Sequence, residues 1–258
     1  MPQNAPSQPA TAQSQASLAV SVVVPVRNEA GNIAPLIAEI VRAMQGTAFE
    51  IVYVNDGSTD ATEQELRGLM AAHPYLRQVR HRQSCGQSAA VRSGVTMARG
   101  PIVATLDGDG QNDPAFIPKL VAVLEAGAPR LGLVAGQRVG RKASGFKKLQ
   151  SRLANAVRNA VLKDGTRDTG CGLKAFRRDL FLALPYFDGQ HRFLPALVRR
   201  EGFEIGYVDV IDRPRGHGVS NYGFWDRLWV GILDLAGVWW LIRRRKRVPN
   251  AEEVTLAG

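Results

Sequence analysis

Residues 18–24 read LAVSVVV and are followed by Pro25, and this Val-rich run sets the pattern from which the fold is predicted. A short apolar run bounded by a proline is typical of a buried parallel strand. Residues 32–44 follow with apolar side chains on one helical face, at Ile33, Leu36, Ile37, Ile40 and Val41. The two segments therefore predict a strand followed by a helix that covers it.

The same alternation continues through the first half of the chain. Further strands are expected near residues 49–54, 77–79, 101–106 and 131–135, and further helices near 59–72, 87–98 and 114–124. Parallel strands need such crossovers, so the pattern predicts an α/β fold with a doubly wound, mostly parallel sheet and helices on both faces. Such sheets bind ligands beyond the carboxyl ends of their strands. The polar residues after Val54 and after Leu106 are expected there.

The remaining segments are assigned from composition. Residues 1–17 are rich in Gln, Ser, Ala and Pro without an apolar leader, and they are expected to form a disordered tail. The second half is expected to hold a basic helix at 142–163, a small-residue loop at 168–172, a strand at 204–211 and a basic, Gly-rich loop to Tyr222. The predicted division is a catalytic domain at 18–222, a C-terminal helix with a basic end at 223–247 and a tail at 248–258.

Charge and cysteine content narrow the class of protein. The formal net charge of +10 indicates attraction to anions, with simple solubility as the alternative. A nucleic-acid-binding protein is disfavoured because the chain has no recognised binding motif. A dinucleotide-binding oxidoreductase is disfavoured because no GxGxxG follows the first strand. Cys85 and Cys171 are far apart, with no CxxC and no Cys/His cluster, so a zinc site is not expected and both thiols are expected to stay reduced.

Two carboxylates follow the apolar run 101–106, in Asp107-Gly108-Asp109. Residues i and i+2 of an extended backbone point to the same side, so both side chains could reach one cation, and Gln111 continues the spacing. Carboxylate and amide oxygens suit Mg²⁺ or Mn²⁺. Asp107, Asp109 and Gln111 are therefore the predicted metal ligands, with a solvated Asp-Gly turn as the alternative.

Two other polar stretches follow the first two expected strands, Pro25-Val26-Arg27-Asn28-Glu29 and Asn55-Asp56-Gly57-Ser58. Asp56 could accept a hydrogen bond from a ring N–H of a nucleobase. The alternative is that Asp56 or Ser58 caps the following helix. For the first stretch the alternative is a polar connection between a strand and a helix.

Taken together, the three stretches resemble the inverting family-two glycosyltransferases of the GT-A fold. Residues 107–114, DGDGQNDP, and 168–177, DTGCGLKAFR, are similar to segments of dolichol- and polyprenyl-phosphate sugar synthases, and the resemblance covers about residues 21–222. It implies a metal-dependent hexosyltransferase, acting in cell envelope biosynthesis, that moves a sugar from a UDP- or GDP-linked donor to a polyprenyl phosphate. Mg²⁺ or Mn²⁺ is the implied cofactor. A glycosyltransferase with a saccharide or protein hydroxyl as acceptor is the alternative.

The resemblance also implies roles for single residues. Asp109, Asp168 and Arg192 are the expected catalytic residues; Pro25, Glu29, Asp56, Asp107 and Gln111 are expected to bind the nucleotide; and Arg138, Lys147, Ser151, Lys174, Arg215 and Ser220 are expected to bind phosphate or the acceptor. Three positions depart from the common family pattern: Asn55 replaces an Asp, Lys147 stands where Arg is frequent, and Asn221 stands where Lys is frequent.

The implied reaction needs cations more than a base. An acceptor phosphomonoester, whose second pKa is about 6, is largely dianionic at neutral pH and can attack without a general base. The metal, with Arg192, Arg215 or Lys174, would offset the charge on the departing diphosphate. Asp168 could orient a basic side chain, or act as a base toward a hydroxyl acceptor. His191 is expected either to contact the sugar or diphosphate or to begin an exposed helix.

The C-terminal segment carries signs of a membrane interface. All four tryptophans lie between Trp225 and Trp240, and Arg243 to Arg247 follow them in a basic run. The apolar run 235–242 is much shorter than the roughly 20 residues that span a bilayer, so an amphipathic helix lying on the membrane is predicted. The alternative is a helix packed on the core or on a partner. The expected protein is cytoplasmic and peripheral on that face of the membrane, with a separate membrane subunit as a further partner.

Overall fold

The computed structural model describes residues 18–139, 158–166, 168–213 and 224–244. Its strands are β1 (Val20–Val26), β2 (Phe49–Asp56), β3 (Leu76–His81), β4 (Ile102–Thr105), β5 (Leu131–Arg138), β6 (Lys174–Arg177) and β7 (Glu204–Val210). Its helices are α1 (Ile33–Ala43), α2 (Thr62–Met70), α3 (Gln87–Met97), α4 (Ile117–Ala126), α6 (Arg178–Ala183), α7 (Leu194–Arg200) and α8 (Phe224–Arg243), with 3₁₀ turns η1 (Pro114–Phe116) and η2 (Gln190–Arg192).

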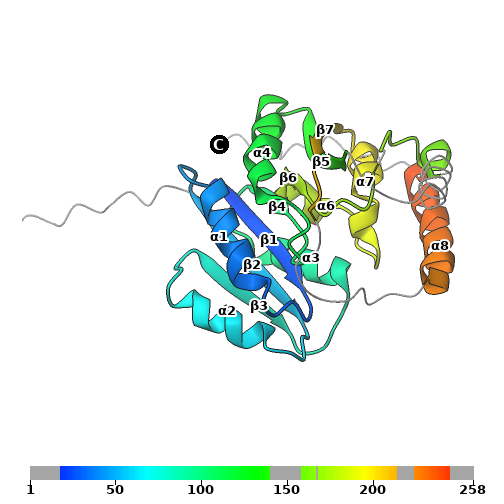
Figure 1. Ribbon diagram of the computed structural model, residues 1–258. Helices are drawn as coiled ribbons and strands as arrows, with labels where there is room; N and C mark the ends of the chain where they lie inside the picture. Colours follow the sequence, from blue (N-terminus) through cyan, green and yellow to red (C-terminus); the bar gives the residue numbers. More distant parts are fainter. Residues whose placement is uncertain (1–17, 140–157, 167, 214–223, 245–258) are drawn as a thin grey trace, which may run out of the picture.

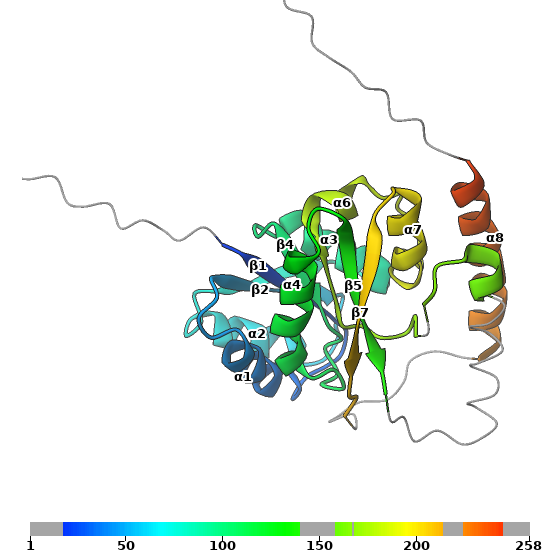
Figure 2. The same cartoon turned by 90° about the horizontal axis from the view of Figure 1, so that it is seen from above.

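The described strands form one seven-stranded sheet in the order β3-β2-β1-β4-β6-β5-β7. All neighbours run parallel except β6, which is antiparallel to both β4 and β5. Helices cover both faces of this sheet (Figures 1 and 2). The prediction of a doubly wound, mostly parallel α/β sheet is therefore confirmed.

The pleat of β1 explains how the first Val-rich run joins two cores. Val20, Val22 and Val24 pack with residues of α1, α2 and α4 on one face, whereas Val23 packs with α3, α6 and α7 on the other. Alternate residues of a strand point to opposite faces, so a central strand must be apolar on both. Ser21 is the exception, and its hydroxyl donates to the buried carboxylate of Glu50 at 2.7 Å.

The structure departs from the expected elements in its second half. β6 and α6 were not predicted, although β6 lies in the middle of the sheet between β4 and β5. Of the basic helix expected at 142–163, only residues 158–163 are described; residues 158–162 are helical and Lys163 is not. The loop expected up to Tyr222 lies outside the described residues beyond Arg213.

Helix α8 packs beside α7 at the end of the sheet away from β3 (Figure 1). Val238 is buried on that side, and the Leu241 carbonyl accepts a hydrogen bond from Arg200 Nε at 3.0 Å. Ile232, Leu233, Trp239 and Trp240 remain exposed. Within the described ranges, no helix combines the length and the apolar character that crossing a bilayer requires.

Candidate active site

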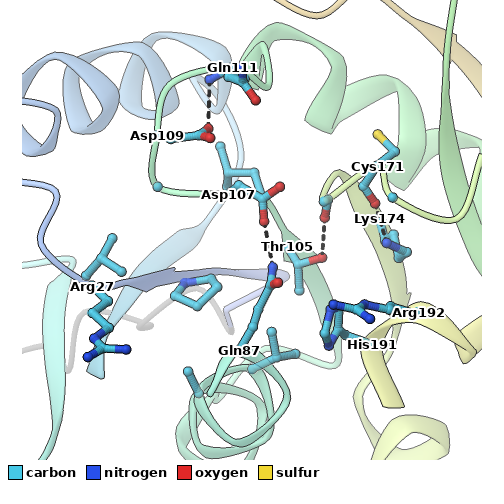
Figure 3. A pocket seen from close by; sticks show the side chains of 18 of the residues that line it. Arg27, Gln87, Thr105, Asp107, Asp109, Gln111, Cys171, Lys174, His191 and Arg192 are labelled. Atoms are coloured by element: carbon cyan, nitrogen blue, oxygen red, sulfur yellow. Dashed lines mark hydrogen bonds between the residues drawn. The ribbon is translucent and has the colours of Figure 1, made fainter. Parts of the chain in front are cut away.

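A cavity of about 620 Å³ opens at the carboxyl ends of β1, β2 and β4 (Figure 3). Its wall brings together nine of the fourteen predicted site residues: Pro25, Glu29, Asp56, Asp107, Asp109, Gln111, Arg138, Lys174 and Arg192. Asp168 is not on the wall, and Lys147, Ser151, Arg215 and Ser220 lie outside the described residues. The location is the one that a doubly wound sheet favours for ligands.

Asp107 stands at the centre of this cavity. Its Oδ1 accepts a hydrogen bond from Gln87 Nε2 at 2.8 Å, and its backbone N–H donates to Asn112 Oδ1 at 3.0 Å. Burial, and then the negative charge of Asp109, raise the pKa of Asp107 to about 6, against the opposing effect of Lys174 and Arg138. The negative charges of Asp107 and Asp109 repel each other, so keeping both ionised is unfavourable unless a cation lies near them.

Asp109 and Gln111 come from the turn that follows β4. The expectation of an extended backbone here is wrong, because β4 ends at Thr105 and residues 108–110 form a turn. Asp109 is 7% exposed, and its Oδ1 accepts the backbone N–H of Gln111 at 3.1 Å. The turn nevertheless brings both carboxylates and the Gln111 side chain to the same cavity (Figure 3).

The backbone at Gly172 approaches the Asp107 carboxylate closely. A Cβ on Gly172 would lie 2.4–2.6 Å from the carboxyl atoms of Asp107, closer than contact allows. The Gly172 carbonyl also accepts the Thr105 hydroxyl at 2.8 Å. Asp107, Asp109 and Gln111 thus form an all-oxygen set with excess negative charge, which fits Mg²⁺ or Mn²⁺.

Asp56 lies at the end of β2 and holds the loop at residues 81–86. Its Oδ1 accepts from Cys85 N–H at 2.8 Å and pairs with His81 Nδ1 at 2.7 Å, and its Oδ2 accepts from Ser84 Oγ and Gly86 N–H. Burial alone would raise the pKa of Asp56, but these donors hold it below its usual value. Helix capping by Asp56 is wrong, because α2 begins at Thr62 with no side-chain cap.

This loop also gathers Asp56, His81 and Cys85, whose possible metal-ligand atoms lie within 4.8 Å of one another. No Cys/His cluster was expected from the sequence; His81 and Cys85 are four positions apart, and Asp56 joins them from the end of β2. Hydrogen bonds account for the arrangement: the carboxylate of Asp56 fills its four acceptor positions, and His81 Nε2 pairs with Ser93 Oγ at 2.9 Å.

Arg138 is held between two acidic side chains. Its Nε and Nη2 bind Asp168 at 2.6 and 2.8 Å, and its Nη1 binds Asp212 at 3.1 Å. Burial alone would raise the pKa of Asp168, but the Arg138 guanidinium holds it below its usual value. Of the two roles expected for Asp168, the structure shows it orienting a basic side chain.

The remaining cations on the wall differ in how they are engaged. Lys174 is buried on β6, its Nζ donates to the Cys171 carbonyl, and burial lowers its pKa. The guanidinium groups of Arg27 and Arg192 make no ion pair or hydrogen bond with any described residue. Within the described ranges, their guanidinium N–H donors are unused, unlike those of Arg138.

The sequence predicted no role for Gln87 or Gly172. It indicated Arg27 only as part of the stretch Pro25 to Glu29. Gln87 opens α3 and reaches Asp107 across the cavity (Figure 3). Its position at the first residue of a helix that follows a predicted strand was the available signal. His191 lies on the cavity wall in η2, so its expected alternative as an exposed helix start is wrong.

Comparison with known proteins adds three findings. The model of the family described as Glycosyl transferase family 2 matches residues 21–184. The dodecaprenyl-phosphate galacturonate synthase of Rhizobium johnstonii is 37% identical over 237 residues, covering 90% of this chain and 69% of that protein. The undecaprenyl-phosphate 4-deoxy-4-formamido-L-arabinose transferase of Pectobacterium carotovorum is 34% identical over 209 residues, covering 80% of this chain and 63% of that protein.

Solved structures share the fold. Glucosyl-3-phosphoglycerate synthase from Mycobacterium tuberculosis, in complex with Mn²⁺, UDP and glucosyl-3-phosphoglycerate, aligns with a TM-score of 0.64 at 22% identity, covering 88% of this chain and 80% of that one. The chain spans less than two thirds of the length of the arabinose transferase and about two thirds of the galacturonate synthase.

Proposed function

The chain belongs to glycosyl transferase family 2, and on that premise we propose that its cavity transfers a sugar from a nucleoside diphosphate to a polyprenyl phosphate. It is a glycosyltransferase of the GT-A fold. Two curated relatives are named for dodecaprenyl phosphate with galacturonate and for undecaprenyl phosphate with a formamido-arabinose. Their names support an isoprenoid phosphate as acceptor and a modified sugar as the transferred group.

The observation that carries the proposal is the division of the cavity between carboxylates and basic side chains that pair with no described residue. Asp107 and Asp109 lie on one part of the wall, and Arg27 and Arg192 on others, without ion pairs in the described structure. A nucleotide-sugar and a lipid phosphate are both anionic. Bringing them together would be favoured by a cation held by the carboxylates, which would offset the diphosphate charge, and by basic groups near the acceptor.

In the proposed reaction an oxygen of the acceptor phosphate attacks the anomeric carbon of the sugar. The new carbon–oxygen bond forms as the bond to the donor diphosphate breaks, and the nucleoside diphosphate leaves with that electron pair. Mg²⁺ or Mn²⁺ held by Asp107, Asp109 and Gln111 would supply electrostatic stabilisation of the diphosphate charge. Solved relatives of the fold contain Mn²⁺ or Mg²⁺ with UDP, which supports a uridine donor.

The chain's own residues supply orientation. Pro25 and Glu29 border the side of the cavity proposed for the nucleoside, and the Glu29 carboxylate accepts from Asn32 Nδ2 at 2.7 Å. For Asp56 to contact a nucleobase, one of its four hydrogen bonds within the protein would have to break. Arg138 keeps two of its five N–H donors after binding Asp168 and Asp212, and these are proposed to meet the acceptor phosphate.

A hydroxyl acceptor would need a general base, and Asp168, the residue expected to serve as one, is poorly suited to that role. Asp168 is ion-paired with Arg138, and its lowered pKa makes it a poor proton acceptor. The phosphate acceptor needs no such group. This difference favours lipid phosphate over a saccharide or protein hydroxyl.

Peripheral association with the cytoplasmic face of the membrane follows from the same proposal. The exposed Trp239 and Trp240 of α8 carry Arg243 and Arg244 over their rings, at 4.2 and 5.3 Å from the ring centroids. Tryptophan and arginine together suit an anionic interface. A separate membrane subunit stays a proposed partner for the same surface.

The test is a transfer assay with purified protein, a short polyprenyl phosphate, Mg²⁺ or Mn²⁺ and a panel of labelled UDP- and GDP-sugars that includes UDP-galacturonate. We expect one donor to give a labelled lipid, and we expect EDTA or Asp109→Asn to abolish it. Asp113→Asn, in the same segment but outside the cavity wall, is the matched control. Transfer to a sugar hydroxyl with no lipid product from any donor would contradict the proposal.

A further inference from the structure

His191 is fixed on the cavity wall by a buried serine. The Ser88 side chain is 2% exposed, and its Oγ lies 2.6 Å from His191 Nδ1 and accepts the His191 backbone N–H at 3.3 Å. The two residues come from α3 and η2, which are 103 positions apart in the chain. The ring is thus held at both its backbone and its Nδ1.

The hydrogen bonds open to the Ser88 hydroxyl indicate which tautomer the His191 ring adopts. The Ser88 hydroxyl has one proton, and among the described residues the only acceptor within reach is His191 Nδ1. If Nδ1 carried the ring proton, the buried hydroxyl proton would have no acceptor, which is costly. The satisfied arrangement has Ser88 donating to Nδ1 and the ring proton on Nε2, which makes no hydrogen bond with a described residue.

The ring is also uncharged. Burial, and then the positive charges of Lys174 and Arg192, lower the pKa of His191 to about 3. The imidazole is therefore neutral near pH 7. It offers the cavity one N–H donor and no positive charge, unlike Arg192 beside it.

The order of groups in a nucleotide-sugar indicates what this donor meets. With the nucleoside near Pro25 and Glu29 and the diphosphate at Asp107 and Asp109, the sugar continues past Asp107. His191 and Arg192 lie on that side of Asp107, opposite Arg27 (Figure 3). We propose that His191, oriented by Ser88, donates its Nε2–H to an oxygen of the donor sugar and so positions and selects that sugar; this rests on the proposed use of a nucleotide-sugar.

The test compares binding of an intact UDP-sugar with binding of UDP, by calorimetry with Mg²⁺. The UDP-sugar is the one that gives lipid product, or UDP-galacturonate if none does. For His191→Phe, which keeps a ring but has no donor, we expect affinity for the UDP-sugar to fall roughly threefold to tenfold while affinity for UDP is unchanged. His191→Gln, which retains an N–H donor, should recover most of the loss.

Two further variants separate this role from a structural one. Ser88→Ala leaves the imidazole but frees its orientation, and we expect a smaller loss of the same kind, again without loss of UDP affinity. His73→Phe changes a histidine that pairs with the Tyr75 hydroxyl away from the cavity, and it should change neither affinity. Should His191→Phe fail to fold, Ser88→Ala and His191→Gln carry the test.

The outcomes distinguish this inference from the proposed function. If His191→Phe lost the same affinity for UDP as for the UDP-sugar, the contact would lie at the diphosphate. If it lost affinity for neither, there would be no contact. Either result overturns the inference. A pH–rate profile between pH 6 and 9 that loses a limb in His191→Gln would also overturn it, because a neutral donor transfers no proton. If the selective loss is found but no lipid product forms, the acceptor assignment fails and the sugar contact stands.

Discussion

The carboxylate of Asp107 meets opposite demands from folding and from the proposed reaction. Its folded pKa is raised to about 6. The carboxylate therefore lowers the free energy of unfolding at any pH above its ordinary pKa, and this loss reaches its full size above pH 6. We expect Asp107→Asn to raise the free energy of unfolding of the metal-free protein at pH 7.5 by about 2 kcal/mol. The same variant should lose transferase activity.

Thermal or urea unfolding in EDTA measures this gain. Asparagine keeps an oxygen that accepts the Gln87 amide, so the cavity wall need not rearrange. Asp60→Asn is the matched control, because Asp60 accepts hydrogen bonds from Thr62 and from Ala30 N–H, and it should be destabilised. A fall in stability of Asp107→Asn as large as that of Asp60→Asn would contradict the prediction.

Gly172 is required by the approach of the Asp107 carboxylate. An added Cβ would come within 2.4–2.6 Å of that group and must displace it. We expect Gly172→Ala to lower kcat/KM on the order of 100-fold, because small shifts of a catalytic group have large effects. Its affinity for Mn²⁺, followed by electron paramagnetic resonance, should fall as well.

The matched control is Gly68→Ala on α2, where a Cβ would meet nothing within 4 Å. A helical glycine replaced by alanine gains about 0.5–1 kcal/mol of stability, and activity should be unchanged. Unaltered Mn²⁺ affinity in Gly172→Ala would show that Asp107 moves without consequence for the metal site.

At the scale of elements, Asp56 ties the end of β2 to the loop between β3 and α3. Its pKa is held below the ordinary value, so the stability it contributes is present above pH 4 and is lost as the pH falls through the folded pKa. We expect Asp56→Asn to lose about 1–3 kcal/mol at pH 7, and the difference from the unchanged protein to narrow below pH 4.

Urea unfolding at pH 7, 5 and 3.5 tests this dependence. Glu204→Gln removes an exposed ion pair with Arg130 and should change stability little at any of these values. A difference between Asp56→Asn and the unchanged protein that stays constant from pH 7 to pH 3.5 would mean that the carboxylate charge is not what holds the loop.

The elements that sequence patterns predicted are those with a local signal. β1, β2 and β4 are apolar runs ended by turn residues, and α1 shows a regular apolar face. β6 has four residues, Lys174 to Arg177, two of them basic, and its place between β4 and β5 depends on pairing with distant strands. No local pattern specifies such pairing.

The same distinction applies to the site. Asp107, Asp109 and Gln111 lie within five residues, so their meeting could be predicted. Arg138 with Asp168 and Asp212, and Ser88 with His191, are joined by contacts between separate segments and needed the fold.

On the scale of the whole molecule, the net charge of +10 and the exposed side of α8 predict how the protein meets a membrane. We expect binding to vesicles that contain anionic lipid, weakened but not abolished between 0.1 and 0.5 M salt, because charge is screened and apolar burial is not. Replacing Leu233 and Trp240 together by Glu should weaken binding on the order of tenfold.

Sedimentation with vesicles measures the binding, and thermal unfolding checks the fold of each variant. Met97→Glu is the control, because Met97, at the end of α3, is an apolar residue about as exposed as Trp240, at 51% against 52%. Loss of vesicle binding in Met97→Glu as large as in the Leu233 and Trp240 variant would show that α8 is not the contacting surface.

Asp234 of α8 lies directly against the turn that leads to His191. A Cβ on Gly189 would come within 2.7 Å of Asp234 Oδ2, and the attraction of Arg192 partly offsets the effect of burial, which raises the pKa of Asp234. The outer helix is therefore in direct contact with the segment that carries part of the cavity wall. If α8 rests on a bilayer, this contact would fix how far the cavity stands from the lipid head groups, and the phosphate of the proposed acceptor would have to reach that far. Chain length beneath the surface would then matter less than how far the phosphate protrudes from it.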